Sequence, residues 1–278
     1  MRILFFILTQ LFCICAAFAW DPTGPYPFGI LTHRSVTLTA EYWNPILTYV
    51  GKKANVQLNL RFARTANEST DMATTGQIAF AYTNHLFTPE RDKLGFTVIA
   101  RPNDDGIRGQ IVVTMNSPIQ SLHELDGQQV AFANPYGFTG YYVPYDALLH
   151  LGINPKPVFA GTQEAAIGQL IHNQVVAAGV NSQVMADFAK REQLSYRILY
   201  SSNLYNDLCI MVHPKVPPTI VQTVRKAFIE MKDDPEGRAV LEESARLIGS
   251  RASGFISAND KDYENYRNFF RTTLVPVK

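Results

Sequence analysis

Short apolar runs alternate with stretches of helical periodicity along almost the whole chain. Apolar runs or apolar–polar alternation predict strands at Phe28–Leu31, Val56–Phe62, Ile78–Tyr82, Thr97–Ala100, Gln110–Met115, Gln129–Ala133, Pro157–Ala160, Val175–Val180, Tyr196–Tyr200 and Leu208–Val212. Helices are predicted at Tyr42–Val50, Tyr141–His150, Thr162–Ile171, Val184–Glu192, after Pro217-Pro218, at Pro235–Leu247 and at Asp260–Phe270. Strands separated by helices predict an α/β architecture, with mixed, mostly parallel sheets flanked by helices.

Two weak boundaries interrupt this alternation, near Asn116-Ser117-Pro118 and at Ser201–Asp207. They suggest that the chain leaves a first lobe, builds a second one and returns. We therefore expect lobe 1 to comprise residues 20–115 and 208–278, and lobe 2, inserted between them, to comprise residues 116–207. Two crossing strands would join the lobes and leave a cleft between them.

The first nineteen residues have the features of a signal peptide. Arg2 supplies a positive start, Ile3–Phe12 is nearly all apolar, and Ala17-Phe18-Ala19 forms a small-x-small cleavage site. The apolar stretch is short for a membrane span, although a retained anchor is the alternative. We expect a mature protein that begins near Trp20 and is exported to the periplasm.

Composition excludes several classes of protein. Removing residues 1–19 removes Cys13 and Cys15, so Cys209 cannot form an internal disulfide and is expected to be a buried apolar residue. Loss of Arg2 leaves 24 basic residues against 24 acidic ones, and no basic stripe indicates nucleic acid or a membrane surface. We expect a monomer without a cofactor.

The segment Ser121–Pro144 carries the strongest functional signal. A predicted strand ends in the polar turn Asn134-Pro135-Tyr136-Gly137, and a helix follows at Thr139-Gly140. The unpaired backbone N–H groups at the start of such a helix attract anions and polar ligands. An ordinary strand–loop–helix corner is the alternative interpretation.

Several phrases, taken in order, resemble a known family. SLHELDGQQVAFANP, GTQEAAIGQL, VVAAGVNSQ and DDPEGRAVLEE, together with the export signal and the inserted lobe, are similar to the phosphonate/phosphite-type periplasmic substrate-binding proteins of ABC transporters. The resemblance runs from roughly Phe28 to Leu247. It implies a type 2 periplasmic binding fold, in which two α/β lobes close on a small solute and the closed form docks on a membrane permease.

The resemblance also implies that the ligand has changed. Phosphonate-binding members usually have three Ser/Thr residues before the glycine of the lobe-two helix, whereas this chain has Gly137-Phe138-Thr139 before Gly140. Gln163 stands near a position where the family often has histidine. Asp207 matches an acidic position that holds the amine of aminophosphonates, but Gln183 replaces the other acid. Because hydrogen bonds to a charged ligand are strong, a less charged or partly apolar solute is expected.

In a two-lobe binding protein the ligand lies where strand ends and helix starts of both lobes converge. The candidate ligand-binding residues are Arg34, Tyr82, Thr83, Asn84, Tyr136, Phe138, Thr139, Gln163, Asn181 and Asp207. For Arg34 a solvated loop position is the alternative. Trp43 is expected in the core and Thr162 as a helix cap, while Phe87 suits either the pocket or the core.

No motif indicates catalysis or a metal site. The sequence has no nucleophile elbow, no phosphate-binding glycine loop with lysine, and no paired cysteine or histidine spacing typical of metal ligands. We expect an exported solute-binding protein that takes up a small molecule or oxyanion for an ABC transporter. The alternatives are the ligand-sensing component of a membrane sensor kinase or cyclase, and a periplasmic enzyme or accessory factor on the same fold.

Overall fold

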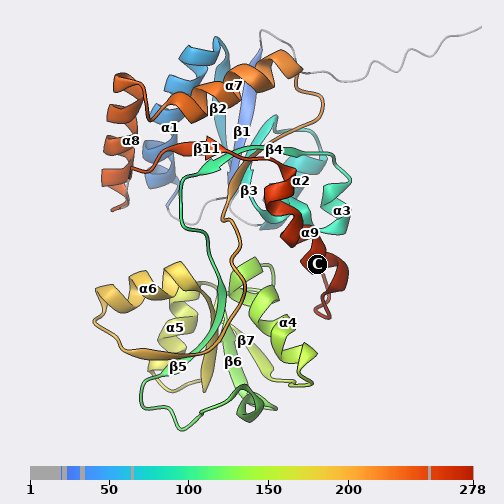
Figure 1. The fold of residues 1–278 in the computed structure, drawn as a ribbon, viewed down its shortest axis with the longest axis vertical. Coiled ribbons are helices and arrows are strands. Elements are labelled where there is room, and N and C mark those ends of the chain that lie inside the picture. The colour runs from blue at the N-terminus through green and yellow to red at the C-terminus, as the bar shows by residue number, and fades with distance from the viewer. Residues whose placement is uncertain (1–19, 21–23, 32–34, 64–65, 250–251, 278) are drawn as a thin grey trace, which may run out of the picture.

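The computed structural model of the protein describes residues 20, 24–31, 35–63, 66–249 and 252–277. It shows two lobes, drawn one above the other in Figure 1, with the chain crossing between them. The predicted signal peptide and Arg34 lie outside the described residues. Within the described ranges, no helix is long and apolar enough to cross a membrane.

The first sheet lies in lobe 1. Its strands are β1 (Pro25–Leu31), β2 (Gln57–Ala63), β3 (Phe80–Thr83), β4 (Thr97–Pro102), β10 (Cys209–Val212) and β11 (Phe255–Ser257). They follow the order β11-β4-β10-β3-β1-β2. The helices of this lobe are α1 (Val36–Ala54), α2 (Ala66–Thr74), α3 (Pro89–Asp92), α7 (Pro218–Glu230), α8 (Pro235–Leu247) and α9 (Glu264–Thr272).

The second sheet lies in lobe 2. Its strands are β5 (Gly109–Thr114), β6 (Gln129–Phe132), β7 (Lys156–Phe159), β8 (Ala177–Asn181) and β9 (Tyr196–Ser201). They follow the order β7-β6-β8-β5-β9. Helices α4 (Val143–His150), α5 (Gln163–Ile171) and α6 (Ser182–Arg191) complete this lobe (Figure 1).

Each predicted strand and helix has a counterpart in the structure, and local signals explain most of the boundaries. The Ser35 hydroxyl caps α1 by accepting from the Leu38 N–H at 3.2 Å, and Asn55 ends the helix with a φ of 53°. The predicted Thr162 cap of α5 is confirmed, since its hydroxyl accepts from the Ala165 N–H at 3.1 Å. The sequence did not predict α2, α3 or β11.

Strand direction departs from the prediction, because parallel pairs do not dominate. β1 is parallel to β2 and β3, and β6 is parallel to β7 and β8, whereas β5 and β10 are antiparallel to all their neighbours. β5 and β10 follow the two crossings, so each enters its sheet from the cleft and runs away from it. The carboxyl ends of β1, β3, β6 and β8 consequently face the cleft.

The first crossing lies earlier than expected. β5 pairs with β8 and β9 in the second sheet, so the predicted boundary after residue 115 falls one strand too late. The Asn116-Ser117-Pro118 signal marks a turn within lobe 2 instead. The two crossing segments meet at Ile107 and Tyr205, which exchange backbone hydrogen bonds of 2.7 and 2.9 Å.

Three buried clusters fill the molecule. One lies in lobe 1 between the sheet and helices α1, α7 and α8, and contains Trp43 and Phe28, so the predicted core position of Trp43 is confirmed. Another lies in lobe 2 beneath α5 and α6. The largest cluster contains Phe87 of lobe 1, Phe132 of lobe 2 and Tyr266 of α9. Buried apolar packing therefore continues from one lobe into the other.

Gly179 provides a test of the lobe 2 packing. A Cβ at this position of β8 would lie 2.2 Å from the Phe132 ring, so we expect Gly179→Ala to destabilise the protein by about 1–3 kcal/mol. Gly168→Ala is the matched control, because a Cβ there meets nothing within 4 Å and alanine favours the helix by up to about 1 kcal/mol. Urea unfolding of both variants measures the difference. Equal stability of Gly179→Ala and the unchanged protein would contradict this packing.

Candidate functional site

A small cavity lies between the two lobes. Asn84, His85, Thr88 and Arg91 line it from lobe 1, Tyr136, Phe138 and Tyr142 line it from lobe 2, and Phe270 of α9 closes it. Its volume is about 10 Å³, which leaves room for roughly one water molecule. The two turns that the sequence singled out, after β3 and after β6, thus meet across the cleft.

The lobe 1 wall begins where β3 ends. Asn84 and Thr88 are buried polar residues at this point, and the Asn84 amide donates weakly to the Tyr266 hydroxyl at 3.4 Å. The hydroxyl of Thr83 turns back to accept from the His85 N–H at 3.0 Å. Thr83 therefore shapes the turn and does not line the cavity.

Arg91 brings a positive charge to the cavity wall. Its guanidinium donates to the His85 carbonyl at 3.1 Å. Burial lowers the pKa of Arg91, although a guanidinium remains charged at neutral pH. The sequence analysis did not select Arg91, because it follows Pro89 in a short polar helix with no recognised motif.

The lobe 2 wall begins with a wide helical turn, Phe138–Tyr142, that precedes α4. The Gly137 carbonyl accepts from the N–H groups of both Tyr141 and Tyr142, at 2.9 and 3.0 Å. This turn presents the ring of Phe138 to the cavity. The helix start predicted at Thr139-Gly140 is therefore present, but as a π turn.

Three of the predicted residues form a hydrogen-bonded network inside lobe 2. The Thr139 hydroxyl accepts from the Asn181 side-chain amide at 3.1 Å, and the Gln163 side-chain oxygen Oε1 accepts from the Asn181 backbone N–H at 2.6 Å. Asn181 in turn caps α6 by accepting from the N–H groups of Gln183 and Val184. These side chains hold the turn after β6 against the ends of β8 and α5.

Tyr82 and Asp207 lie on the lobe 1 side near the second crossing. The Tyr82 ring packs on Trp43, with centroids 4.7 Å apart. Burial raises the pKa of the Tyr82 phenol well above its usual value, and the nearby Asp207 carboxylate adds to this effect. An aromatic face beside a carboxylate suits an ammonium group.

Asp207 is partly buried, and its ionisation is disfavoured. Burial, followed by the nearby Asp104 carboxylate, raises the pKa of Asp207 to about 6, against the opposing effect of a hydrogen bond from the Leu208 N–H. A cationic partner would offset both the cost of burying the Asp207 charge and its repulsion by Asp104. The carboxylate is thus arranged to gain from a positively charged ligand group.

Phe138 is the centre of an aromatic cluster. Its ring stacks on Tyr266 with centroids 4.1 Å apart, and contacts Tyr205, Phe269 and Phe270 at 4.8 to 5.5 Å. Phe87, which suited either pocket or core, lies in the core and stacks on Tyr263. Aromatic side chains of lobe 2, the second crossing and α9 therefore meet around Phe138.

The structure groups the predicted residues in three places. Asn84, Tyr136 and Phe138 line the cavity; Thr139, Gln163 and Asn181 form the lobe 2 network; Tyr82 and Asp207 lie near the crossing. The sequence analysis missed several residues that line the cavity, which are His85, Thr88, Arg91, Tyr142 and Phe270. An amphipathic pattern with Tyr266, Phe269 and Phe270 on one face marks α9, but it does not indicate what that face contacts.

The predicted absence of a metal site stays a prediction, because the structure describes only part of the chain. Among those residues, no group of three or more His, Cys, Asp or Glu side chains is placed to hold a metal ion. Cys209 is fully buried, as predicted, and its thiol donates to the Thr83 carbonyl at 3.2 Å.

Comparison with protein families decides the class of the chain. The model for the phosphonate-type periplasmic substrate-binding protein of ABC transporters matches residues 28–263. The chain belongs to this family. The family comprises substrate-binding components of transporters and not enzymes. No individual curated protein matches the sequence.

Solved structures show the same fold. PhnD1 from Prochlorococcus marinus, in complex with methylphosphonate, has a TM-score of 0.70 at 16% identity, over 89% of this chain and 97% of its own. A binding protein component of an ABC phosphonate transporter from Pseudomonas aeruginosa has a TM-score of 0.70 at 16% identity, over 89% of this chain and 85% of its own. XAC2383 from Xanthomonas citri, bound to ATP, has a TM-score of 0.73 at 15% identity, over 89% of this chain and 96% of its own. These likenesses establish the two-lobe type 2 periplasmic binding fold.

The raised pKa of Asp207 predicts a pH-dependent stability. In the folded protein the Asp207 carboxyl group keeps its proton up to about pH 6, whereas in the unfolded chain it loses the proton near pH 4. Folding therefore takes up a proton between about pH 4 and pH 6, and the contribution of Asp207 to the free energy of unfolding falls as pH rises through this range. We expect Asp207→Asn to match the unchanged protein at pH 4 and to exceed its unfolding free energy by about 1–3 kcal/mol at pH 7.

Urea unfolding at pH 4, 5, 6 and 7 measures this difference. Asp105→Asn, at an exposed position two residues before Ile107 of the first crossing, controls for the loss of one negative charge. A difference between Asp207→Asn and the unchanged protein that stays constant with pH would contradict the assignment.

Proposed function

We propose that this chain is an exported, periplasmic solute-binding protein that captures a small molecule between its two lobes and delivers it to an ABC permease. One observation carries the proposal: the cavity of a family member is lined by strand-end residues of both lobes. Asn84 follows β3, and Tyr136 and Phe138 follow β6. A solute that touches both walls would stabilise the closed form through contacts absent from the open one.

The ligand we propose is small, partly apolar and carries an amine. Phe138 occupies a place in the turn where phosphonate binders have a hydroxyl, and the Thr139 hydroxyl and Gln163 amide already bond to Asn181. These groups therefore offer fewer donors to a phosphonate oxyanion. Tyr82 and Asp207 instead offer an aromatic face and a carboxylate.

A compact anionic group of the same solute would suit the interlobe cavity, which Tyr82 and Asp207 do not line. Arg91 lines the cavity and can pair with a carboxylate through two parallel N–H donors. A bulky or doubly charged group would require more donors than the described walls provide. Amine-bearing solutes with a single carboxylate, such as amino-acid-like molecules, are thus the class that we favour.

A thermal-shift screen of the mature protein tests the ligand class. The panel contains phosphate, phosphite, simple phosphonates, sulfonates, carboxylates, amino acids and small aromatic amines. We expect amines to raise Tm most and phosphate or simple phosphonates to have little effect, because the oxyanion-binding hydroxyls are missing. Strong stabilisation by phosphate or a simple phosphonate would contradict the altered turn.

Asp207→Asn tests the amine contact with the best solute of the screen. A hydrogen bond to a charged group contributes about 1.5–3 kcal/mol, so its loss should raise Kd roughly 10- to 100-fold in calorimetry at pH 7.5. Asp105→Asn, at an exposed position beside Asp104, is the control for the loss of one negative charge and should leave Kd unchanged. The amine assignment fails if both variants bind alike.

The same calorimetry distinguishes a binding protein from an enzyme. We expect one solute per chain and, by mass spectrometry, recovery of the solute in unchanged form. Chemical conversion of the solute would place the protein among enzymes that share the fold and would refute the proposal.

A further inference from the structure

We propose that the C-terminal segment Asp260–Val277 is a strap that binds lobe 2 and holds the two lobes together when the cleft contains no solute. The matched family region ends at Tyr263, and α9 begins at the next residue. In Figure 1 α9 lies between the lobes and the chain end approaches α4.

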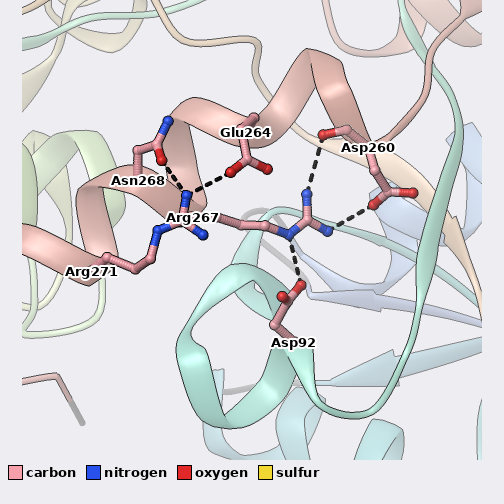
Figure 2. Close-up of polar contacts among 6 residues, drawn as sticks. All are labelled: Asp92, Asp260, Glu264, Arg267, Asn268 and Arg271. Atoms are coloured by element: carbon pink, nitrogen blue, oxygen red, sulfur yellow. Dashed lines mark hydrogen bonds and ion pairs between the residues drawn. The ribbon is translucent and has the colours of Figure 1, made fainter.

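The strap is anchored to lobe 1 through Arg267. Its guanidinium forms ion pairs with Asp92 at 2.8 Å and Asp260 at 2.7 Å, and donates to the Asp260 carbonyl at 3.1 Å (Figure 2). It also lies over the Phe87 ring, 4.9 Å from the centroid. With 13% of the side chain exposed, this is a desolvated, multiply bonded anchor.

The remaining polar side chains of α9 serve the helix itself. Arg271 pairs with Glu264 at 2.6 Å and donates to Asn268, so this arginine is bonded within α9 (Figure 2). The charged side chains of α9 thus form ion pairs with Asp92 of lobe 1 or with residues of the strap itself. Its aromatic side chains lie elsewhere.

The aromatic face of α9 packs on lobe 2. Tyr266 stacks on Phe138, and Phe270 contacts both Phe138 and Tyr142, each at 5.5 Å between centroids. Tyr266 is fully buried and Phe270 nearly so. Opening the cleft would expose these rings to water, and the cost of that exposure favours the closed arrangement.

The residues after α9 bind lobe 2 directly. One carboxylate oxygen of Asp146, on α4, accepts from the Thr273 hydroxyl at 2.8 Å and from the Leu274 N–H at 2.7 Å. Val275, which follows, is buried in the cluster shared by the lobes. The chain therefore leaves lobe 1 at Arg267 and ends on lobe 2.

The strap also fixes the second crossing. The Tyr266 hydroxyl donates to the Asn206 carbonyl at 2.6 Å, and the Asn206 amide donates to the Asp262 carbonyl at 2.8 Å. Asn265 donates to the Leu204 carbonyl at 3.3 Å. A change in the interlobe angle must displace these bonds, because hinge motion alters the backbone of crossing segments.

The strap covers the place where we propose that a solute binds, and this consequence rests on the proposed function. Tyr266 lies against Phe138 and near Asn84, and the remaining cavity holds roughly one water molecule. A solute must therefore displace the rings of α9, so solute and strap compete for the cleft.

Interlobe distance in the solute-free protein tests the strap. Cysteines introduced at the exposed residues Lys226 of α7 and Lys190 of α6 can carry spin labels, while fully buried Cys209 stays unlabelled in the mature chain. We expect one narrow distance in the unchanged protein. Asp146→Ala, Thr273→Val and Phe270→Ala should each add a longer, broader population.

Thr272→Val is the matched control, because the neighbouring Thr272 hydroxyl donates within α9 to the Asn268 carbonyl. This variant should keep the narrow distance. Circular dichroism and Tm verify that each variant is folded. A long-distance population in the unchanged protein equal to that of the variants, or no change in any folded variant, would overturn the strap.

Solute affinity supplies the second readout. If the strap leaves roughly one molecule in ten open, Asp146→Ala should lower Kd for the best solute about tenfold, since more molecules are ready to bind. The distance measurement contains no solute, so its failure refutes the strap alone. Absence of solute binding in every variant would refute the proposed function alone.

Discussion

The ring of Phe138 lies 4.1 Å from the ring of Tyr266, and this stacked contact joins lobe 2 to the C-terminal helix of the chain. Tyr205, Phe269 and Phe270 contact the same ring, so an aromatic cluster lies between lobe 2 and α9. Because aromatic rings bury large apolar areas, separating them costs free energy that a solute must replace with contacts of its own. The cluster thereby shapes the cavity and contributes to the free energy needed to separate the two lobes.

The geometry of the crossings explains why the site lies where it does. Strands β5 and β10 enter their sheets from the cleft. The strands antiparallel to them, β8 and β3, and the strands parallel to those, β6 and β1, therefore end at the cleft and present the residues that follow. In lobe 1 this places Asn84 at the cavity, and in lobe 2 it places Tyr136 and Phe138 there. The chain belongs to the family. The side chains of Thr139 and Gln163 are bonded to Asn181 beside this wall of the cavity.

Local signals allowed most of the fold to be predicted. The Thr162 cap and the apolar runs of β6 and β8 depend on residues that are neighbours in the sequence, and they are present in the structure as expected. The polar helix α2 and the three-residue strand β11 have weak periodicity, and so they were missed. The partners of Phe138 lie at the other end of the sequence, and no local pattern relates them. For the same reason the candidate site was predicted in its two turns but not in Arg91 or α9.

The most direct test of this account is a double-mutant cycle between Phe138 and Tyr266. Phe138→Leu, Tyr266→Leu and the double variant keep apolar volume while removing the stacked rings, and urea unfolding of the solute-free protein gives the interaction free energy. The account predicts a coupling of about 0.5–1.5 kcal/mol beyond the burial of each ring. Additive effects, with a coupling indistinguishable from zero, would show that the two rings do not stack in solution and would contradict the account.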